Sequence, residues 1–194
     1  SLGKHSSRCY GAPKLRTYMK NWYSFKYSLR ADFSRYLFGI DRYSKAKTLF
    51  MSVGFTSVII IRLQNYFYGK RRFFIAYSLH RLNLMWHGID VLPGCSIGPG
   101  IFIQHPSGIV IGSGVVIGKN VTIMQGTTIG LGFKDENWQM GYPVIGDNVA
   151  VMPNCVISGN VVIGENSLIG ANSVVLNSFG PNSKIVGAPA RLVP

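Results

Sequence analysis

Aliphatic residues recur at every sixth position through the second half of the chain. The series slips by two residues after Ile109 and resumes after a gap that follows Ile129. Its members are Val91, Ile97, Ile103, Ile109, Ile111, Ile117, Ile123, Ile129, Ile145, Val151, Ile157, Ile163, Ile169 and Val175. A six-residue period means that each repeat forms one short strand and that three strands complete one turn of a triangular coil. The pattern therefore predicts a mainly β, coiled domain over 89–194 with these anchors stacked inside it.

The first half of the chain has a different period. Aromatic and aliphatic residues recur every three or four positions over 14–88, and proline is absent between Pro13 and Pro93, so this region is predicted to be α-helical. Residues 1–13 are expected to form a flexible N-terminus. The candidate helix starts are Asp32, Asp41 and Ser44, and the candidate breaks are Gly39, Gly54 and Gly69. We expect these helices to cap one open end of the coil.

The segment 131–142 interrupts the six-residue repeat. Insertions in a regular solenoid are extruded from one corner, and such loops commonly carry specificity. We expect this loop to reach the groove of a neighbouring subunit, with Trp138 or Tyr142 giving an apolar wall. A mobile surface loop is the alternative.

Charge is distributed unevenly along the chain. The formal net charge is +13, yet nearly all lysines and arginines lie at or before Arg81, among Tyr, Phe and Trp residues. This asymmetry favours a basic aromatic face on the N-terminal region, suited to a membrane surface, an anionic glycan or a phosphorylated cofactor, over a nucleic-acid-binding protein. A solvated helical face is the plain alternative.

Cysteine usage and hydropathy restrict the class of protein further. Cys9, Cys95 and Cys155 form no CxxC pair, so the sequence predicts neither a disulfide framework nor a metal site. The most apolar run, Leu49–Ile61, is too interrupted for a membrane span. With no secretory signal visible, we expect a cytoplasmic protein, placed at the inner face of the membrane if the basic region binds lipid.

Four motifs carry a resemblance to a known family. They are Gly88-Ile89-Asp90-Val91, Ile103-Gln104-His105-Pro106-Ser107-Gly108-Ile109-Val110-Ile111-Gly112, Gly126-Thr127-Thr128-Ile129-Gly130 and Ile185-Val186-Gly187-Ala188-Pro189-Ala190-Arg191. In these motifs the chain resembles the hexapeptide-repeat acyltransferases, and within them the serine acetyltransferase branch with its exopolysaccharide (colanic-acid-type) O-acetyltransferase relatives. The resemblance implies a left-handed parallel β-helix with an N-terminal α-helical segment and an extruded loop.

The resemblance also implies a reaction and an assembly. It implies homotrimers, which in some relatives pair through their N-terminal helices, with acetyl-CoA bound as cosubstrate between neighbouring coils and no metal. His105 would remove the proton from the acceptor hydroxyl as its oxygen attacks the thioester, a task for which imidazole is well matched near neutral pH. Asp90 would hold the imidazole in the required tautomer, although it could instead only cap the first turn.

Further site residues follow from the same resemblance. The cofactor-binding candidates are Gly130, Lys134, Met152, Pro153, Gly170, Ala171, Lys184 and Arg191, and the acceptor-binding candidates are Gln104, Tyr142, Trp138 and Asp41. His80 and His87 are expected to be packing or surface residues.

Three positions depart from the serine acetyltransferase pattern. Where that branch has an aspartate before the histidine and an Arg-His pair at the end of the loop, this chain has Gln104, Gly141 and Tyr142. Neutral hydrogen-bonding and aromatic residues suit a sugar better than a zwitterion. The sequence therefore favours a saccharide acceptor, as in capsule or exopolysaccharide synthesis, over serine O-acetyltransfer or a non-catalytic assembly module.

Overall fold

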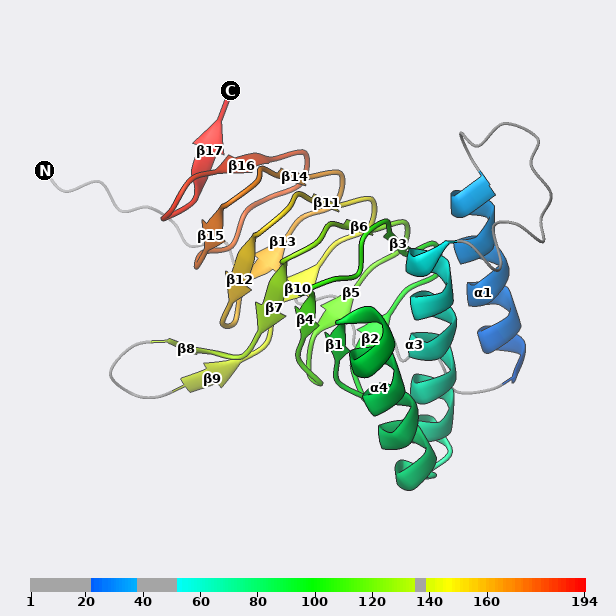
Figure 1. Ribbon diagram of the computed structural model, residues 1–194. Coiled ribbons are helices and arrows are strands. Elements are labelled where there is room, and N and C mark those ends of the chain that lie inside the picture. Colours follow the sequence, from blue (N-terminus) through cyan, green and yellow to red (C-terminus); the bar gives the residue numbers. More distant parts are fainter. Residues whose placement is uncertain (1–21, 38–51, 135–138) are drawn as a thin grey trace, which may run out of the picture.

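The computed structural model describes residues 22–37, 52–134 and 139–194. Three helices, α1 (Trp22–Leu37), α3 (Val53–Gly69) and α4 (Phe73–His87), precede a coil of short strands (Figure 1). Asp41 and Trp138 lie outside the described residues, as do Gly39 and Ser44. The helical segment and the left-handed β-helix match the predicted fold.

The coil is a three-sided prism whose strands pair in parallel, except that the last strand, β17, runs antiparallel to β16. The first sheet is ordered β1 (Asp90–Val91), β4 (Val110–Ile111), β7 (Thr128–Gly130), β12 (Val156–Ser158) and β15 (Val174–Val175). The second is β2 (Ser96–Ile97), β5 (Val116–Ile117), β10 (Val144–Ile145) and β13 (Val162–Ile163). The third is β3 (Phe102–Ile103), β6 (Thr122–Ile123), β11 (Ala150–Val151), β14 (Leu168–Ile169), β16 (Lys184–Val186) and β17 (Arg191–Val193).

The anchors fill the interior of the prism. All fourteen aliphatic residues of the six-residue series are at most 1% exposed, and equivalent anchors of successive coils are paired in register, as Ile103 with Ile123. Burying one such side chain contributes about 1.5–3 kcal/mol. The prediction that the anchors point inward is confirmed.

Three edges connect the sheets. The chain turns from the third sheet to the first at 104–108, 124–127, 152–155 and 170–173, which together we call the His105 edge. It turns from the first sheet to the second at 112–115, 130–143, 158–161 and 176–179, the loop edge. Along the remaining edge, four asparagines with positive φ are joined side chain to side chain: Asn120, Asn148, Asn166 and Asn182.

The helices close one end of the coil through a buried ion pair. Arg62 on α3 bonds both carboxylate oxygens of Asp32 on α1, at 2.8 and 3.0 Å, and donates to the carbonyls of Ile97 and Gly98 at 2.6 Å. Asp32 also accepts from the backbone N–H of Gly100 and Ile101. Asp32 therefore lies inside α1 and is not a helix start, because its carboxylate serves Arg62 and the first coil rather than its own helix.

Two further helix predictions can be compared with the structure. Gly69 ends α3 as expected, whereas Gly54 does not break a helix but lies in the first turn of α3, which Ser52 caps through the N–H of Phe55. A side chain at Gly54 would collide with the carbonyl oxygen of Ile103, so glycine lets α3 touch the coil.

Other expectations concern membranes and thiols. No described helix is long and apolar enough to cross a bilayer. Cys95 and Cys155 are free and buried, and burial raises the pKa of both thiols, that of Cys95 to about 11. Both therefore stay protonated near neutral pH.

Candidate active site

His105 lies on an enlarged corner of the coil. Eight positions separate the consecutive strand anchors Ile103 and Ile111, where a regular repeat has six, so this corner carries two additional residues. His105 is exposed there, and Gln104 beside it is exposed as well. The two-residue slip in the sequence pattern therefore marks the corner that presents the imidazole to solvent.

Tyr36 and α3 hold this corner in place. The Tyr36 hydroxyl accepts from the N–H of Ile103 at 2.9 Å and donates to the Ile103 carbonyl at 2.7 Å. Burial raises the pKa of Tyr36, so the hydroxyl keeps its proton for the second bond. Together with the close approach of Gly54 to Ile103, this fixes the backbone two residues before His105.

Asp90 lies on the coil next to the His105 corner. The N–H of Gly108 donates to Gly88 and the N–H of Asp90 donates to Ile109, both at 2.8 Å. The Asp90 carboxylate is engaged by His80 on α4, whose Nε2 lies 2.8 Å from Oδ1. A carboxylate only accepts, so the His80 ring donates this bond. His80, which was expected to be a packing or surface residue, is 12% exposed and packs between α4 and the first strand with the Asp90 carboxylate as its hydrogen-bond partner.

Small and uncharged residues continue the His105 edge on the following coils. On each following coil, two residues occupy the positions that Gln104 and His105 hold on the first. They are Met124 and Gln125, then Met152 and Pro153, and then Gly170 and Ala171. Four of the cofactor-binding candidates thus share one edge with His105. Sequence reasoning missed Gln125, whose Oε1 is buried without a hydrogen-bond partner among the described residues. Gln125 lies one coil beyond His105 on the same edge, and its Oε1 has no solvent-exposed surface.

Tyr142 and Gly130 lie on the loop edge, at the other side of the first sheet from His105. The Tyr142 ring covers Gly112 and Gly114, where an added Cβ would lie against its carbons, and it packs on the core. No atom lies within 4 Å of the position that a Cβ would take at Gly130. Within one chain, the structure therefore does not bring these two candidates to His105.

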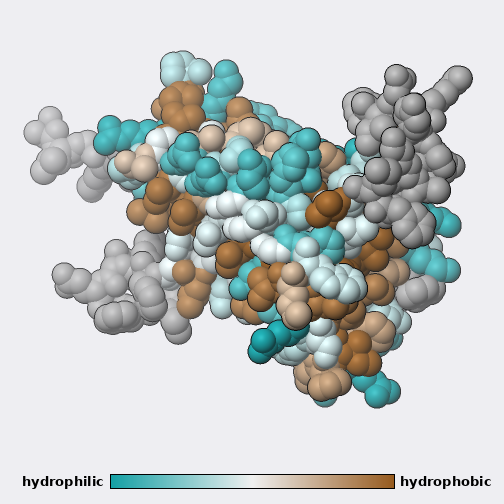
Figure 2. All heavy atoms as spheres, in the orientation of Figure 1, coloured by the Kyte–Doolittle hydropathy of each residue, from teal (hydrophilic) through white to brown (hydrophobic). Residues whose placement is uncertain are grey.

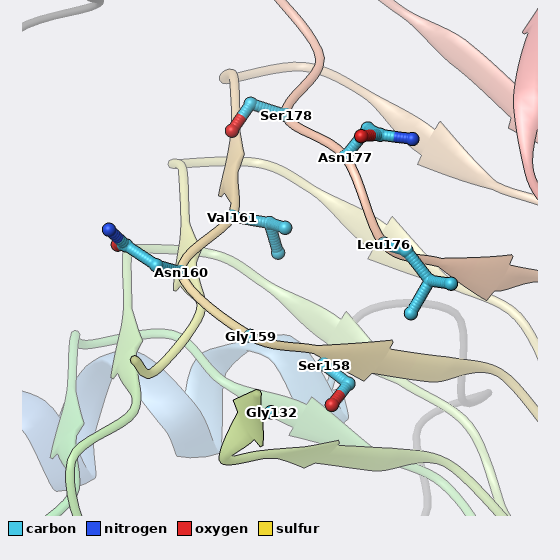
Figure 3. A pocket seen from close by; sticks show the side chains of 8 residues that line it. All are labelled: Gly132, Ser158, Gly159, Asn160, Val161, Leu176, Asn177 and Ser178. Carbon is cyan, nitrogen blue, oxygen red and sulfur yellow. The ribbon is translucent and has the colours of Figure 1, made fainter. Parts of the chain in front are cut away.

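A pocket of about 160 Å³ occupies the same loop edge, next to the hairpin of β8 (Gly132–Lys134) and β9 (Gln139–Gly141). Figure 3 shows the residues that line it: Gly132, Ser158, Gly159, Asn160, Val161, Leu176, Asn177 and Ser178. Val161 and Leu176 give it an apolar wall, and the serine and asparagine side chains give it hydrogen-bonding groups.

Two of the three cationic candidates lie near the C-terminal end of the coil. Lys184 begins β16 and is exposed, and Arg191 begins β17, paired with Val186. Lys134 ends β8 on the loop edge. No cluster of three His, Cys, Asp or Glu side chains suited to a metal ion occurs among the described residues.

Comparisons with known proteins agree with this architecture. Residues 142–177 match the family model described as bacterial transferase hexapeptide (six repeats). The chain is 41% identical to a serine acetyltransferase of Staphylococcus xylosus over 126 residues, 65% of this chain and 57% of that protein. It is 35% identical to a serine acetyltransferase of Helicobacter pylori strain J99 over 150 residues, 77% of this chain and 86% of that protein.

Solved structures extend the similarity to the helices. A serine acetyltransferase in complex with CoA superposes with a TM-score of 0.79 at 30% identity, covering 88% of this chain and 70% of that one. The chain spans just over half the length of the S. xylosus relative but most of the H. pylori one. By its repeats, its helical cap and these similarities, the chain belongs to the hexapeptide-repeat transferase family, in the serine acetyltransferase branch.

Proposed function

We propose that the chain is an acetyl-CoA-dependent O-acetyltransferase with His105 as its general base. The observation that carries the proposal is the His105 edge, where an exposed imidazole is followed on the next coils by uncharged residues that become small toward the C-terminal end, at Pro153, Gly170 and Ala171. Small residues let the thin pantetheine arm of CoA approach the backbone. A relative of the same fold was solved with CoA bound, which supports this ligand.

The edge also suits the length of the ligand. Four strand-to-strand steps separate β3 from β16, so the His105 corner and the last coil lie roughly 19 Å apart at about 4.8 Å per step. This is close to the reach of an extended pantetheine arm. With the thioester beside His105, the phosphates come near Arg191 and Lys184, whose cations bind them.

The chain's own residues account for the proton transfers. His105 takes the proton of the acceptor hydroxyl while the oxygen attacks the thioester carbonyl. The tetrahedral intermediate collapses with loss of the CoA thiolate, which receives the proton back from the imidazolium. Asp90 stabilises that imidazolium, and His80 orients Asp90 through Oδ1 and leaves Oδ2 available.

A complete site needs a second subunit. Tyr142, Gly130 and the 160 Å³ pocket lie on the loop edge, across the first sheet from His105. In the expected homotrimer, the loop edge of one subunit faces the His105 edge of the next, and the CoA arm lies between them. The oligomeric state in solution, measured by light scattering, tests this arrangement, and a monomer that is fully active would contradict it.

L-Serine is the acceptor that the comparisons support. The relatives described above are serine acetyltransferases, and none of these similarities supports a role in polysaccharide synthesis. We therefore place serine ahead of the saccharide that the sequence pattern favoured.

A saccharide hydroxyl remains the second candidate because of one specific observation. The residues that flank His105 and follow it along the edge, Gln104, Gln125, Met152 and Pro153, are all uncharged. An ionised amino acid needs charged partners, whereas sugar hydroxyls pair well with amides such as those of Gln104 and Gln125.

One assay tests the function and separates the two acceptors. The purified chain is given acetyl-CoA with L-serine, or with a panel of mono- and oligosaccharides, and the release of free CoA thiol is followed. Turnover with either class, lost in His105→Ala, supports the acetyltransferase. No thiol release with any acceptor, together with no CoA binding by calorimetry, would overturn it in favour of an assembly module.

A further inference from the structure

The turn between α3 and α4 carries adjacent cationic and aromatic residues. Lys70, Arg71 and Arg72 are exposed and are followed directly by Phe73, 49% exposed, and Phe74, 86% exposed. We call these five residues the hairpin tip. Arg71 has a φ of 58°, which makes the reversal between the helices tight and brings the cations and the two rings close together.

The cations of the hairpin tip have no carboxylate near them in the sequence. No aspartate or glutamate occurs between Asp41 and Asp90. Lys70 lies over the ring of Tyr66, 5.8 Å from its centroid, and no ion pair of Lys70, Arg71 or Arg72 occurs among the described residues. Arg62, which lies further back along α3, by contrast forms an ion pair with Asp32. The hairpin tip is therefore a concentrated positive surface.

The hairpin tip projects away from the coil. In Figure 1 the turn between α3 and α4 lies at the far end of the helices from their junction with the sheets. Figure 2 shows hydrophobic and strongly hydrophilic side chains side by side at this end of the molecule. Among the described residues, the side chains of Lys70, Arg71, Arg72, Phe73 and Phe74 are all exposed at this end of the molecule.

The outer side of α4 extends this surface. Only Ala76 and Asn83 of the helix are buried, while Tyr77, Met85 and Trp86 are 47%, 78% and 69% exposed. Residues three or four apart share one helix face, so Phe74, Tyr77, Arg81 and Met85 form a continuous stripe. A helix with this much exposed apolar area, next to the three cations of the hairpin tip and with Arg81 in the stripe itself, is typical of an interfacial helix.

The charge of the hairpin tip favours some binding partners over others. Two copies meeting tip to tip would place three cations against three cations with no acid to offset them, so self-association is disfavoured. A purely polyanionic partner would neutralise the cations but leave Phe73 and Phe74 in water. An anionic lipid surface suits both the cations and the rings. Its phosphates bind the cations, and the aromatic rings are buried at the boundary between headgroups and acyl chains.

We propose that the hairpin tip docks this protein on an anionic membrane surface, with Phe73 and Phe74 entering the boundary between headgroups and acyl chains and Lys70, Arg71 and Arg72 contacting lipid phosphates. This docking is independent of acetyl transfer, because it uses none of the residues of the His105 edge.

Vesicle flotation of the full chain tests the proposal. Vesicles of phosphatidylcholine with phosphatidylglycerol should carry the protein, and vesicles of phosphatidylcholine alone should not. Each cation near an anionic surface contributes roughly five-fold to partitioning, so Lys70→Gln/Arg71→Gln/Arg72→Gln should weaken binding on the order of 100-fold. Phe73→Ser/Phe74→Ser should weaken it at least ten-fold at unchanged charge, because two exposed rings lose their apolar burial.

Matched control variants distinguish binding through the hairpin tip from the effect of removing any cation or any exposed apolar side chain. Lys119→Gln, on the asparagine edge, and Leu192→Ser, 62% exposed on β17, should both float like the parent chain. Equal binding to the two kinds of vesicle, or flotation that survives the Phe73/Phe74 change, would overturn the proposal. So would heparin binding of similar strength that depends on the cations but not on the rings, since this identifies a soluble polyanion as the partner.

Discussion

His80 Nε2 lies 2.8 Å from Asp90 Oδ1, and this contact joins the last helix to the first strand of the coil. On the proposed role of Asp90 in positioning the His105 ring, His80→Ala should lower kcat roughly ten- to 100-fold with little change in the KM for acetyl-CoA, because the Asp90 carboxylate loses its partner on α4. His80→Gln, whose amide N–H can reach Asp90, should restore part of the rate. The measurement is steady-state kinetics of thiol release, with kcat and the KM for acetyl-CoA determined separately for each variant.

A neighbouring change serves as the control for His80. Ser78→Ala, on the exposed side of α4, should leave both kinetic constants as they are. If His80→Ala and Ser78→Ala behaved alike, Asp90 would not need its helix partner.

His105→Ala removes the proposed base itself. Turnover should fall by about 10²- to 10⁴-fold, the usual contribution of a positioned base, while CoA binding and the oligomeric state stay unchanged. Calorimetry with CoA and light scattering measure these two properties. Near-normal turnover in this variant would assign the proton transfer to another group.

Tyr36→Phe tests the support beneath the His105 corner. The change keeps the ring contacts with Phe55 and Phe102 but removes both hydrogen bonds to Ile103. Leaving a buried N–H and C=O without partners should lower the free energy of unfolding by about 1–3 kcal/mol. We also expect slower turnover, because the backbone before His105 loosens. Denaturant titration and the thiol-release assay measure the two effects, and Phe33→Leu, which alters a neighbouring ring but no bond to Ile103, is the control for turnover.

Asp32→Ala should be among the most destabilising single changes in the helical cap. It leaves Arg62 buried, 1% exposed, without its counter-ion, and the loss of one partner of a buried pair typically costs about 3–5 kcal/mol. The double change Asp32→Leu/Arg62→Met removes both charges and should recover much of that loss. Urea unfolding of the three proteins makes the comparison, and equal stability of Asp32→Ala and the parent would show that the pair does not hold the cap.

Burial lowers the pKa of His87, whose ring bonds Thr56 and Asn83. The unfolded chain therefore binds a proton at this site more readily than the folded chain does. The corresponding stability is present above the ordinary histidine pKa and is lost as the pH falls below it. The drop in melting temperature between pH 7.5 and pH 5 should be smaller for His87→Gln than for the parent. An equal drop would mean that other groups control this pH dependence.

The regular part of the fold and the corner that carries His105 could be predicted because their signals are local. Each anchor stacks on its equivalent one coil away, so the period itself encodes the prism, and the slip between Ile103 and Ile111 marks the corner that carries His105. The contacts of Asp90 and Asp32 could not be predicted from the sequence. They depend on how α4 and α1 cross the first coil, and no spacing in the sequence encodes that angle.

Candidate residues on the loop edge show the same limit. Tyr142 lies at the end of the interruption, but its ring covers Gly112 and Gly114 on the loop edge, and within one chain it does not approach His105. A sequence pattern assigns residues to edges of the prism, whereas the partner that completes the site follows from the assembly.

The reversed direction of β17 has a consequence for how such a chain can aggregate. Parallel strands at the end of a stacked coil offer unpaired backbone groups that would template a further rung from another molecule. Here β17 folds back antiparallel on β16, so it occupies the place in the third sheet where a further parallel strand would pair. At the opposite end of the prism, Arg62 donates hydrogen bonds to two backbone carbonyls. Both ends of the prism are therefore poor templates for strand pairing with another molecule, which disfavours head-to-tail fibrils. Ordered assembly is left to contacts between the sides of neighbouring prisms.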